Sequence, residues 1–298
     1  MNRREFLKSS LAGAGMIAAV TQGPVGLLGA DEAAKGTVLK LCSQAGPVPG
    51  KSMKEKIELL QKWGAAAIEL AGNPDVKEVQ DALKGSSLKV SALCWGSHAG
   101  DLVSPDKAKQ TKGIDDLKIA LDKAGELQAA GVIFVPTFNN QSKLKPEELD
   151  KVLLDILPAL GDYAQKCKTH VILEPLNKKE TFYLNRVEQA VAICEKLNNP
   201  GIAAMGDFYH MSKEEKSDEA AFITGGRWLR HVHLATGASR ILPGQEDHSY
   251  VAGFRGLKKI GYQGFCSFES GCKKGTDRAE EMPKAMAFLR KQWDEATI

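Results

Sequence analysis

Four polar side chains follow four apolar runs in the second half of the chain, at Glu174 in "ILEPLN", Asp207 in "MGDFYH", His233 in "HVHLA" and Glu269 in "SFES". They lie 33, 26 and 36 residues apart. Three carboxylates that converge repel one another unless a cation lies between them. Three oxygen donors and one imidazole suit Mn²⁺, Mg²⁺ or Co²⁺, with Zn²⁺ as an alternative that here lacks its preferred thiolates. The four residues predict a site for one divalent metal ion.

The elements that must position these residues repeat along the chain. Short apolar runs alternate with amphipathic stretches that carry apolar residues three and four apart, which predicts strands followed by helices. The expected strands cover residues 37–43, 66–72, 89–95, 131–137, 169–175, 201–207, 230–235 and 264–270. Eight such units in one α/β domain, residues 31–298, predict a single (β/α)8 TIM barrel. A doubly wound sheet is the alternative, but no Gly-rich phosphate loop follows the first strand.

Residues 1–30 are set apart from this domain. Arg3 and Arg4, followed by Phe6, Leu7 and Lys8 and a weakly apolar stretch, are typical of a twin-arginine signal peptide. We therefore expect a bacterial protein exported to the periplasm, with cleavage near Ala30 and no stable membrane anchor in the mature form. Such export disfavours phosphorylated cytoplasmic intermediates as substrates.

The net charge argues against nucleic acid as a partner, and the cysteine spacing argues against a disulfide framework. The net charge of +3 falls to about +1 without residues 1–30. This is too little positive charge to attract nucleic acid. The six cysteines have no regular spacing, and we interpret them as small buried apolar residues rather than a disulfide framework. The sequence leaves a homo-oligomer open.

The motifs "LEPLNKKE", "GDFYHM", "HVHLA" with "SRILPG", and "GYQGFCSFES" resemble the sugar phosphate isomerase/epimerase family. This family of xylose isomerase-like TIM barrels includes ketose 3-epimerases and hydroxypyruvate isomerases. The resemblance implies that Glu174, Asp207, His233 and Glu269 hold a divalent metal, and that Glu174 and Glu269 are also the catalytic acid/base pair. It further implies that His210, Arg240 and Glu180 bind a small carbohydrate substrate.

The residues suit this chemistry. A metal that chelates the carbonyl and hydroxyl oxygens of an α-hydroxy ketone acidifies the carbon-bound proton and stabilises an enediolate. Two glutamates on opposite faces can then remove and return a proton, which gives an isomerase or an epimerase. A lyase or dehydratase acting on a keto-sugar, keto-inositol or oxidised glycoside begins with the same step and is the alternative. An apurinic-site endonuclease would need three zinc ions and more than six histidines.

Further residues of the expected site lie at or near other strand ends. Trp95 and His98, in the expected loop after the third strand, are predicted to bind substrate as a wall of the pocket. Phe208 and Tyr209, in the expected loop after Asp207, are further candidates for such a wall. Glu69, at the expected end of the second strand, either reaches substrate or ties loops together. His231 precedes His233 by two residues and should point the same way one layer deeper, as a buried, hydrogen-bonded histidine.

Overall fold

The strands form one closed parallel barrel. The structure, a computed structural model, describes residues 36–298. Each strand pairs with its neighbours in chain order, and β1 also pairs with β8. The strands are β1 (Leu41–Gln44), β2 (Ala67–Ala71), β3 (Lys89–Gly96), β4 (Val132–Phe134), β5 (Val171–Leu173), β6 (Ile202–Asp207), β7 (Leu229–Leu234) and β8 (Phe265–Phe268). The predicted TIM barrel is therefore confirmed.

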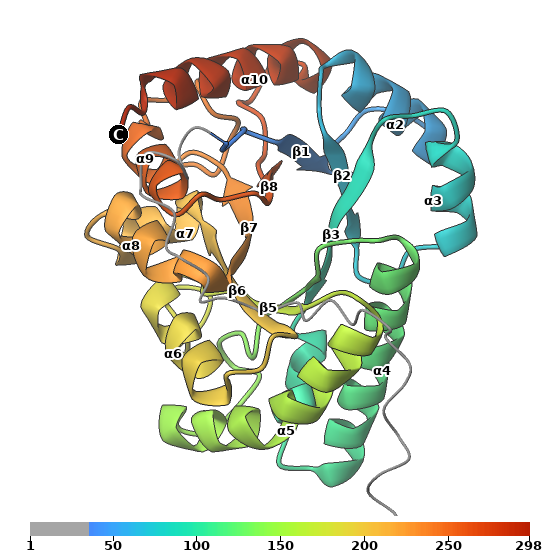
Figure 1. Ribbon diagram of the computed structural model, residues 1–298, viewed down its shortest axis with the longest axis vertical. Helices are drawn as coiled ribbons and strands as arrows, with labels where there is room; N and C mark the ends of the chain where they lie inside the picture. Colours follow the sequence, from blue (N-terminus) through green and yellow to red (C-terminus); the bar gives the residue numbers. More distant parts are fainter. Residues whose placement is uncertain (1–35) are drawn as a thin grey trace, which may run out of the picture.

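Helices surround this barrel, as Figure 1 shows. Several begin at side-chain caps: Ser52, Asp106 and Asp277 each accept a hydrogen bond from a backbone N–H of the first helical turn. The α-helices are α2 (Met53–Lys62), α3 (Val76–Leu83), α4 (Lys107–Glu126), α5 (Pro146–Lys166), α6 (Val187–Leu197), α7 (Phe208–Glu214), α8 (Asp218–Gly225), α9 (Val251–Lys259) and α10 (Arg278–Glu295). Two 3-10 helices, η1 (His98–Val103) and η2 (Gly226–Trp228), complete the set in the described part of the chain.

The core has two parts because side chains along a strand alternate between its two faces. One large apolar cluster lies between the strands and the helices. A smaller cluster forms from inward-facing strand residues, namely Ala92, Ile133, Ile172, Ala203 and Met205. Side chains thus fill the barrel rather than leave a pore. The strands present their carboxyl-terminal ends at one face, where the candidate site lies.

The observed elements differ from the predicted ones in places that bear on the site. All eight strands are present, but β1 begins at Leu41, the first residue paired with β8, rather than at residue 37. Trp95 lies within β3 rather than in a loop, and Glu69 lies in the middle of β2 rather than at its end. The segment after Asp207 is the helix α7, not a loop, because the Asp207 carboxylate accepts the Tyr209 N–H and caps it.

Residues 1–35 lie outside the described part of the chain, and with them the predicted signal peptide. Among residues 36–298, no helix has both the length and the apolar character needed to cross a membrane. All six cysteines lie in this range and carry free thiols.

Candidate active site

The structure brings together the four residues that the sequence singled out as metal ligands. Glu174 follows the last residue of β5, Asp207 ends β6, His233 lies one residue before the end of β7, and Glu269 follows β8. Asp207 and His233 are direct partners in the β6–β7 register. One ligand atom from each of the four lies within 4.8 Å of all the others. We call Glu174, Asp207, His233 and Glu269 the four-residue cluster.

Three residues of the cluster are buried, Glu269 is partly exposed, and the polar atoms are not fully paired. His233 Nδ1 lies 2.7 Å from Glu269 Oε2 and 3.3 Å from Glu174 Oε1. Within the described residues, His233 Nδ1 and Glu174 Oε1 nevertheless have no hydrogen-bond partner of suitable geometry. Asp207 and His233 are at most 1% exposed. Buried polar atoms without partners are rare and point to a missing ligand.

The electrostatics of the cluster reflect crowded negative charge. Burial, followed by repulsion from Glu269, raises the pKa of Asp207 to about 7. Burial also raises the pKa of Glu174. For Glu269 burial acts in the same direction, but attraction to His233 and Arg240 outweighs it and lowers the pKa to about 2. A bound cation would relieve this repulsion.

Three carboxylates and one imidazole, with two unpaired atoms among them, fit a single divalent cation. The donors are mainly hard oxygens, as Mn²⁺, Mg²⁺ and Co²⁺ prefer, and the one nitrogen donor also suits Zn²⁺. Glu174, Asp207, His233 and Glu269 are the residues that would hold the ion.

Glu69 and His231 lie on the inner side of this cluster. The Glu69 carboxylate lies 2.7 Å from His231 Nε2 and 3.1–3.2 Å from His233 Nε2. All three residues are fully buried. Burial raises the pKa of Glu69, but the two histidines more than offset it and hold the pKa well below its usual range. His231 is thus the buried, hydrogen-bonded histidine that the alternation predicted, whereas Glu69 reaches neither surface loops nor solvent.

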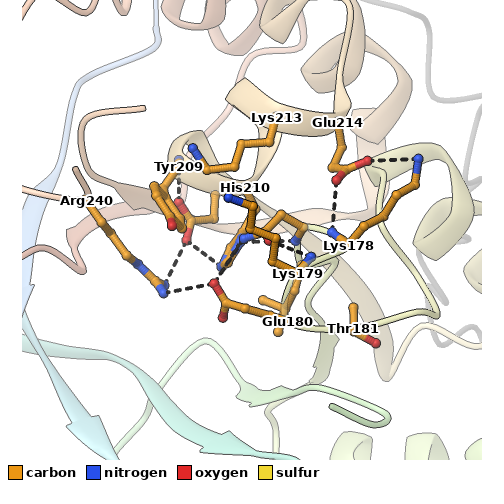
Figure 2. A network of polar contacts seen from close by, with 12 residues as sticks. Lys178, Lys179, Glu180, Thr181, Tyr209, His210, Lys213, Glu214 and Arg240 are labelled. Carbon is orange, nitrogen blue, oxygen red and sulfur yellow. Dashed lines mark hydrogen bonds and ion pairs between the residues drawn. The ribbon is translucent and has the colours of Figure 1, made fainter. Parts of the chain in front are cut away.

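His210, which is labelled in Figure 2, is held beside the cluster by Asn177. The backbone N–H of Asn177 donates to His210 Nδ1 at 3.1 Å, and its side-chain Nδ2 lies 2.7 Å from the same atom. Burial, with repulsion by Arg240, lowers the pKa of His210 to about 3, so the ring is neutral at pH 7. Its proton therefore lies on Nε2, 3.4 Å from Asp207 Oδ2. This buried donor has no hydrogen-bond partner among residues 36–298 and is directed at the cluster.

Arg240 and Glu180 extend the site outward. In Figure 2 the guanidinium of Arg240 lies between Tyr209 and Glu180. Its Nη2 is 2.7 Å from Glu269 Oε2 and 3.3 Å from Asp207 Oδ2, and its Nη1 is 3.8 Å from Glu180 Oε1. The guanidinium also stacks on the Tyr209 ring, with 4.8 Å to its centroid. Arg240 therefore contacts the four-residue cluster directly, and Glu180 lies next to Arg240 and His210.

Trp95 and His98 form a separate contact. Their rings stack with centroids 3.9 Å apart, and His98 Nδ1 lies 3.5 Å from Asp116 Oδ2 on α4. Alternation along β3 directs Ala92 and Cys94 into the barrel and Trp95 into the outer core. A substrate-binding role for Trp95 and His98 stays a prediction.

Sequence reasoning missed Asn177 as a site residue, although it lies inside the quoted motif "LEPLNKKE". Its signal was its position three residues after a predicted metal ligand. Of the two aromatic residues expected as pocket walls after Asp207, Tyr209 stacks on the guanidinium of Arg240, and Phe208 is buried in the apolar core.

The chain belongs to the xylose isomerase-like TIM barrel family, which it matches over residues 57–292. Two proteins to which it is similar are sugar epimerases. It is 28% identical over 254 residues to the 3-dehydro-D-guloside 4-epimerase of Escherichia coli K12, covering 80% of this chain and 95% of that protein. It is 30% identical over 247 residues to the ketose 3-epimerase of Arthrobacter globiformis, covering 78% of this chain and 83% of that protein. The crystal structure of apo 3-keto-D-glucoside 4-epimerase from E. coli has the same fold, with a TM-score of 0.78, 24% identity and coverage of 85% and 100%.

Proposed function

We propose that the protein is a divalent-metal-dependent epimerase of a ketose or keto-sugar. The observation that carries this proposal is the four-residue cluster, in which two glutamates, one aspartate and one histidine converge within 4.8 Å at the mouth of the barrel. The names of the relatives support the substrate class, because they act on ketoses and on 3-keto sugars.

The four-residue cluster would hold the metal ion. When bound, the ion would polarise the carbonyl oxygen and the neighbouring hydroxyl oxygen of the substrate. Arg240 would keep one cationic group at the outer edge of the cluster, where it contacts Glu269 and Asp207. Arg240 and Glu180, each about one-third exposed, would position the part of the sugar that points toward solvent.

Glu174 and Glu269 would transfer the proton. They project from β5 and β8, on either side of Asp207 and His233. One carboxylate removes the proton from the carbon next to the carbonyl, and the C–H electron pair passes into the enediolate. The other carboxylic acid returns a proton to the opposite face of the same carbon, which inverts its configuration. Return of the proton to the neighbouring carbon would instead isomerise the sugar.

His210 would bind the oxygen that becomes negative. Because Asn177 donates to Nδ1, the Nε2–H of the neutral ring is the group available to a substrate oxygen. A donor placed in advance in a buried site stabilises developing charge more than water does.

Product analysis tests this proposal. The purified protein, loaded with Mn²⁺ after chelator treatment, is incubated with free ketoses and with 3-keto-glucosides, and products are separated by chromatography and mass spectrometry. The expected product has unchanged mass and one inverted centre, and chelation abolishes its formation. Loss of water or of an aglycone would instead assign the lyase or dehydratase function.

We also propose that the protein is exported. Arg3 and Arg4 begin the predicted signal, and a periplasmic location suits an unphosphorylated substrate. Replacing both arginines by lysine should retain the protein in the cytoplasmic fraction. Unchanged periplasmic recovery of this variant would contradict the twin-arginine route.

A further inference from the structure

Glu69 is a buried carboxylate to which the proposed chemistry assigns no role. It comes from the middle of β2, more than 160 residues before the histidines that it contacts on β7. It is 0% exposed, so it reaches neither solvent nor a substrate entering from the mouth of the barrel. A buried charge is costly unless it is paired, and both of its oxygens are paired with histidine nitrogens.

The donors and acceptors of this contact determine one tautomer. An ionised carboxylate only accepts hydrogen bonds, so each Nε2 that approaches Glu69 must carry the proton. Because a metal ion binds the neutral imidazole, the Nδ1 of a metal-bound His233 is then the nitrogen that supplies the lone pair. That atom faces Glu174 and Glu269, at 3.3 and 2.7 Å, and has no hydrogen-bond partner in the described structure. Glu69 thus directs the metal-binding nitrogen of His233 into the four-residue cluster.

We propose that Glu69 is a positioning residue that fixes the tautomer and orientation of His233 for metal binding. This inference rests on the proposed metal-dependent function. The pair follows a general arrangement in which the second nitrogen of a metal-bound histidine donates to a carboxylate. The three side chains Glu69, His231 and His233 do not need an ion of their own, because their contacts of 2.7–3.2 Å are ordinary hydrogen-bond distances.

His231 offers a matched control. It contacts the same carboxylate at 2.7 Å and is equally buried, but its ring centroid lies 5.0 Å from that of His233. His231→Gln keeps an N–H donor for Glu69 and leaves the Glu69–His233 contact in place. Glu69→Gln offers one acceptor oxygen and one NH₂ group, so one of the two histidine rings loses its acceptor.

Calorimetric titration of the metal-free, full-length protein with Mn²⁺ tests the proposal, together with the melting temperature of each variant. Glu69→Gln should weaken Mn²⁺ binding by about 10–100-fold. His231→Gln should lower the melting temperature while Mn²⁺ affinity stays near that of the wild type. Equal Mn²⁺ affinity of folded Glu69→Gln and the wild type would overturn this inference alone. A wild type that binds no divalent cation would overturn the proposed function itself.

A second measurement uses only the wild type, so it does not depend on the folding of a variant. In the Zn²⁺-loaded wild type, the ¹⁵N spectrum of labelled histidines should show a proton on Nε2 of His233 and none on Nδ1. A proton on Nδ1, with Nε2 unprotonated, would overturn the proposal.

Discussion

Asp207→Asn should stabilise the metal-free protein while it destroys the metal site. Asp207 is 1% exposed, and burial together with repulsion from Glu269 raises its pKa from 3.8 to about 7. An asparagine keeps the shape of the side chain and can still accept the Tyr209 N–H that begins α7. It removes the ionised group that the folded state tolerates poorly.

The size and the sign of this effect follow from the raised pKa. Because the folded state binds the Asp207 proton more tightly than the unfolded chain does, metal-free wild-type protein loses stability as pH rises from about 4 to about 7. At about 1.36 kcal/mol per pKa unit, the loss reaches about 4 kcal/mol. For a chain of this size that is roughly 8–16 °C in melting temperature. Asp207→Asn should not lose stability in this way. The stability of the variant should therefore exceed that of the metal-free wild type most at pH 8 and only slightly at pH 4.

The assay is thermal unfolding of both proteins with a chelator and with excess Mn²⁺, at pH 4 and at pH 8. Mn²⁺ should raise the melting temperature of the wild type at pH 8 and leave the variant unchanged. Asp75→Asn is the control, because Asp75 also caps a helix, α3, but is exposed and far in sequence from the cluster. A metal-free Asp207→Asn protein that melts below the wild type at pH 8 would refute the reasoning.

Two further variants test the packing of the barrel and the role of Asn177. Gly201→Ala places a Cβ 2.0 Å from the carbonyl oxygen of Gly161 on α5. This variant should lower the free energy of unfolding, measured in urea, by about 1–3 kcal/mol. The control is Gly46→Ala, whose Cβ would meet no atom within 4 Å and should change the free energy of unfolding by at most about 0.5 kcal/mol. Equal stabilities of the two variants would refute the close approach of Gly201 to Gly161. Asn177→Ala loses the side-chain contact that helps to hold His210, so kcat should fall about tenfold with little change in KM. An unchanged kcat would exclude this positioning role.

Strand spacing made much of the site predictable. In a parallel barrel all strands present their carboxyl ends at one face, so residues one unit apart must converge. Glu174, Asp207, His233 and Glu269 could therefore be placed together before any coordinates were known. The helix α7 could not be predicted in this way. Its start depends on a cap formed by Asp207, and the sequence pattern had already assigned Asp207 to the metal.

The supporting residues were harder to predict because their partners are distant in sequence. Glu69 and His233 are separated by 164 residues, and only the closed barrel brings β2 within reach of β7. A carboxylate inside the apolar run "AAIELAG" was the available signal. Trp95, an aromatic residue near a strand end, packs in the outer core of the barrel, and its role as a wall of the substrate pocket stays a prediction.

Solvent exchange during turnover tests the central claim most directly. The Mn²⁺-loaded protein is incubated in D₂O with the ketose or keto-sugar that it converts, and the product is analysed by NMR and mass spectrometry. Proton transfer by Glu174 and Glu269 predicts solvent deuterium at the inverted carbon, and loss of turnover in both Glu174→Gln and Glu269→Gln. An inverted product without deuterium, formed at the same rate by both variants, would contradict the account.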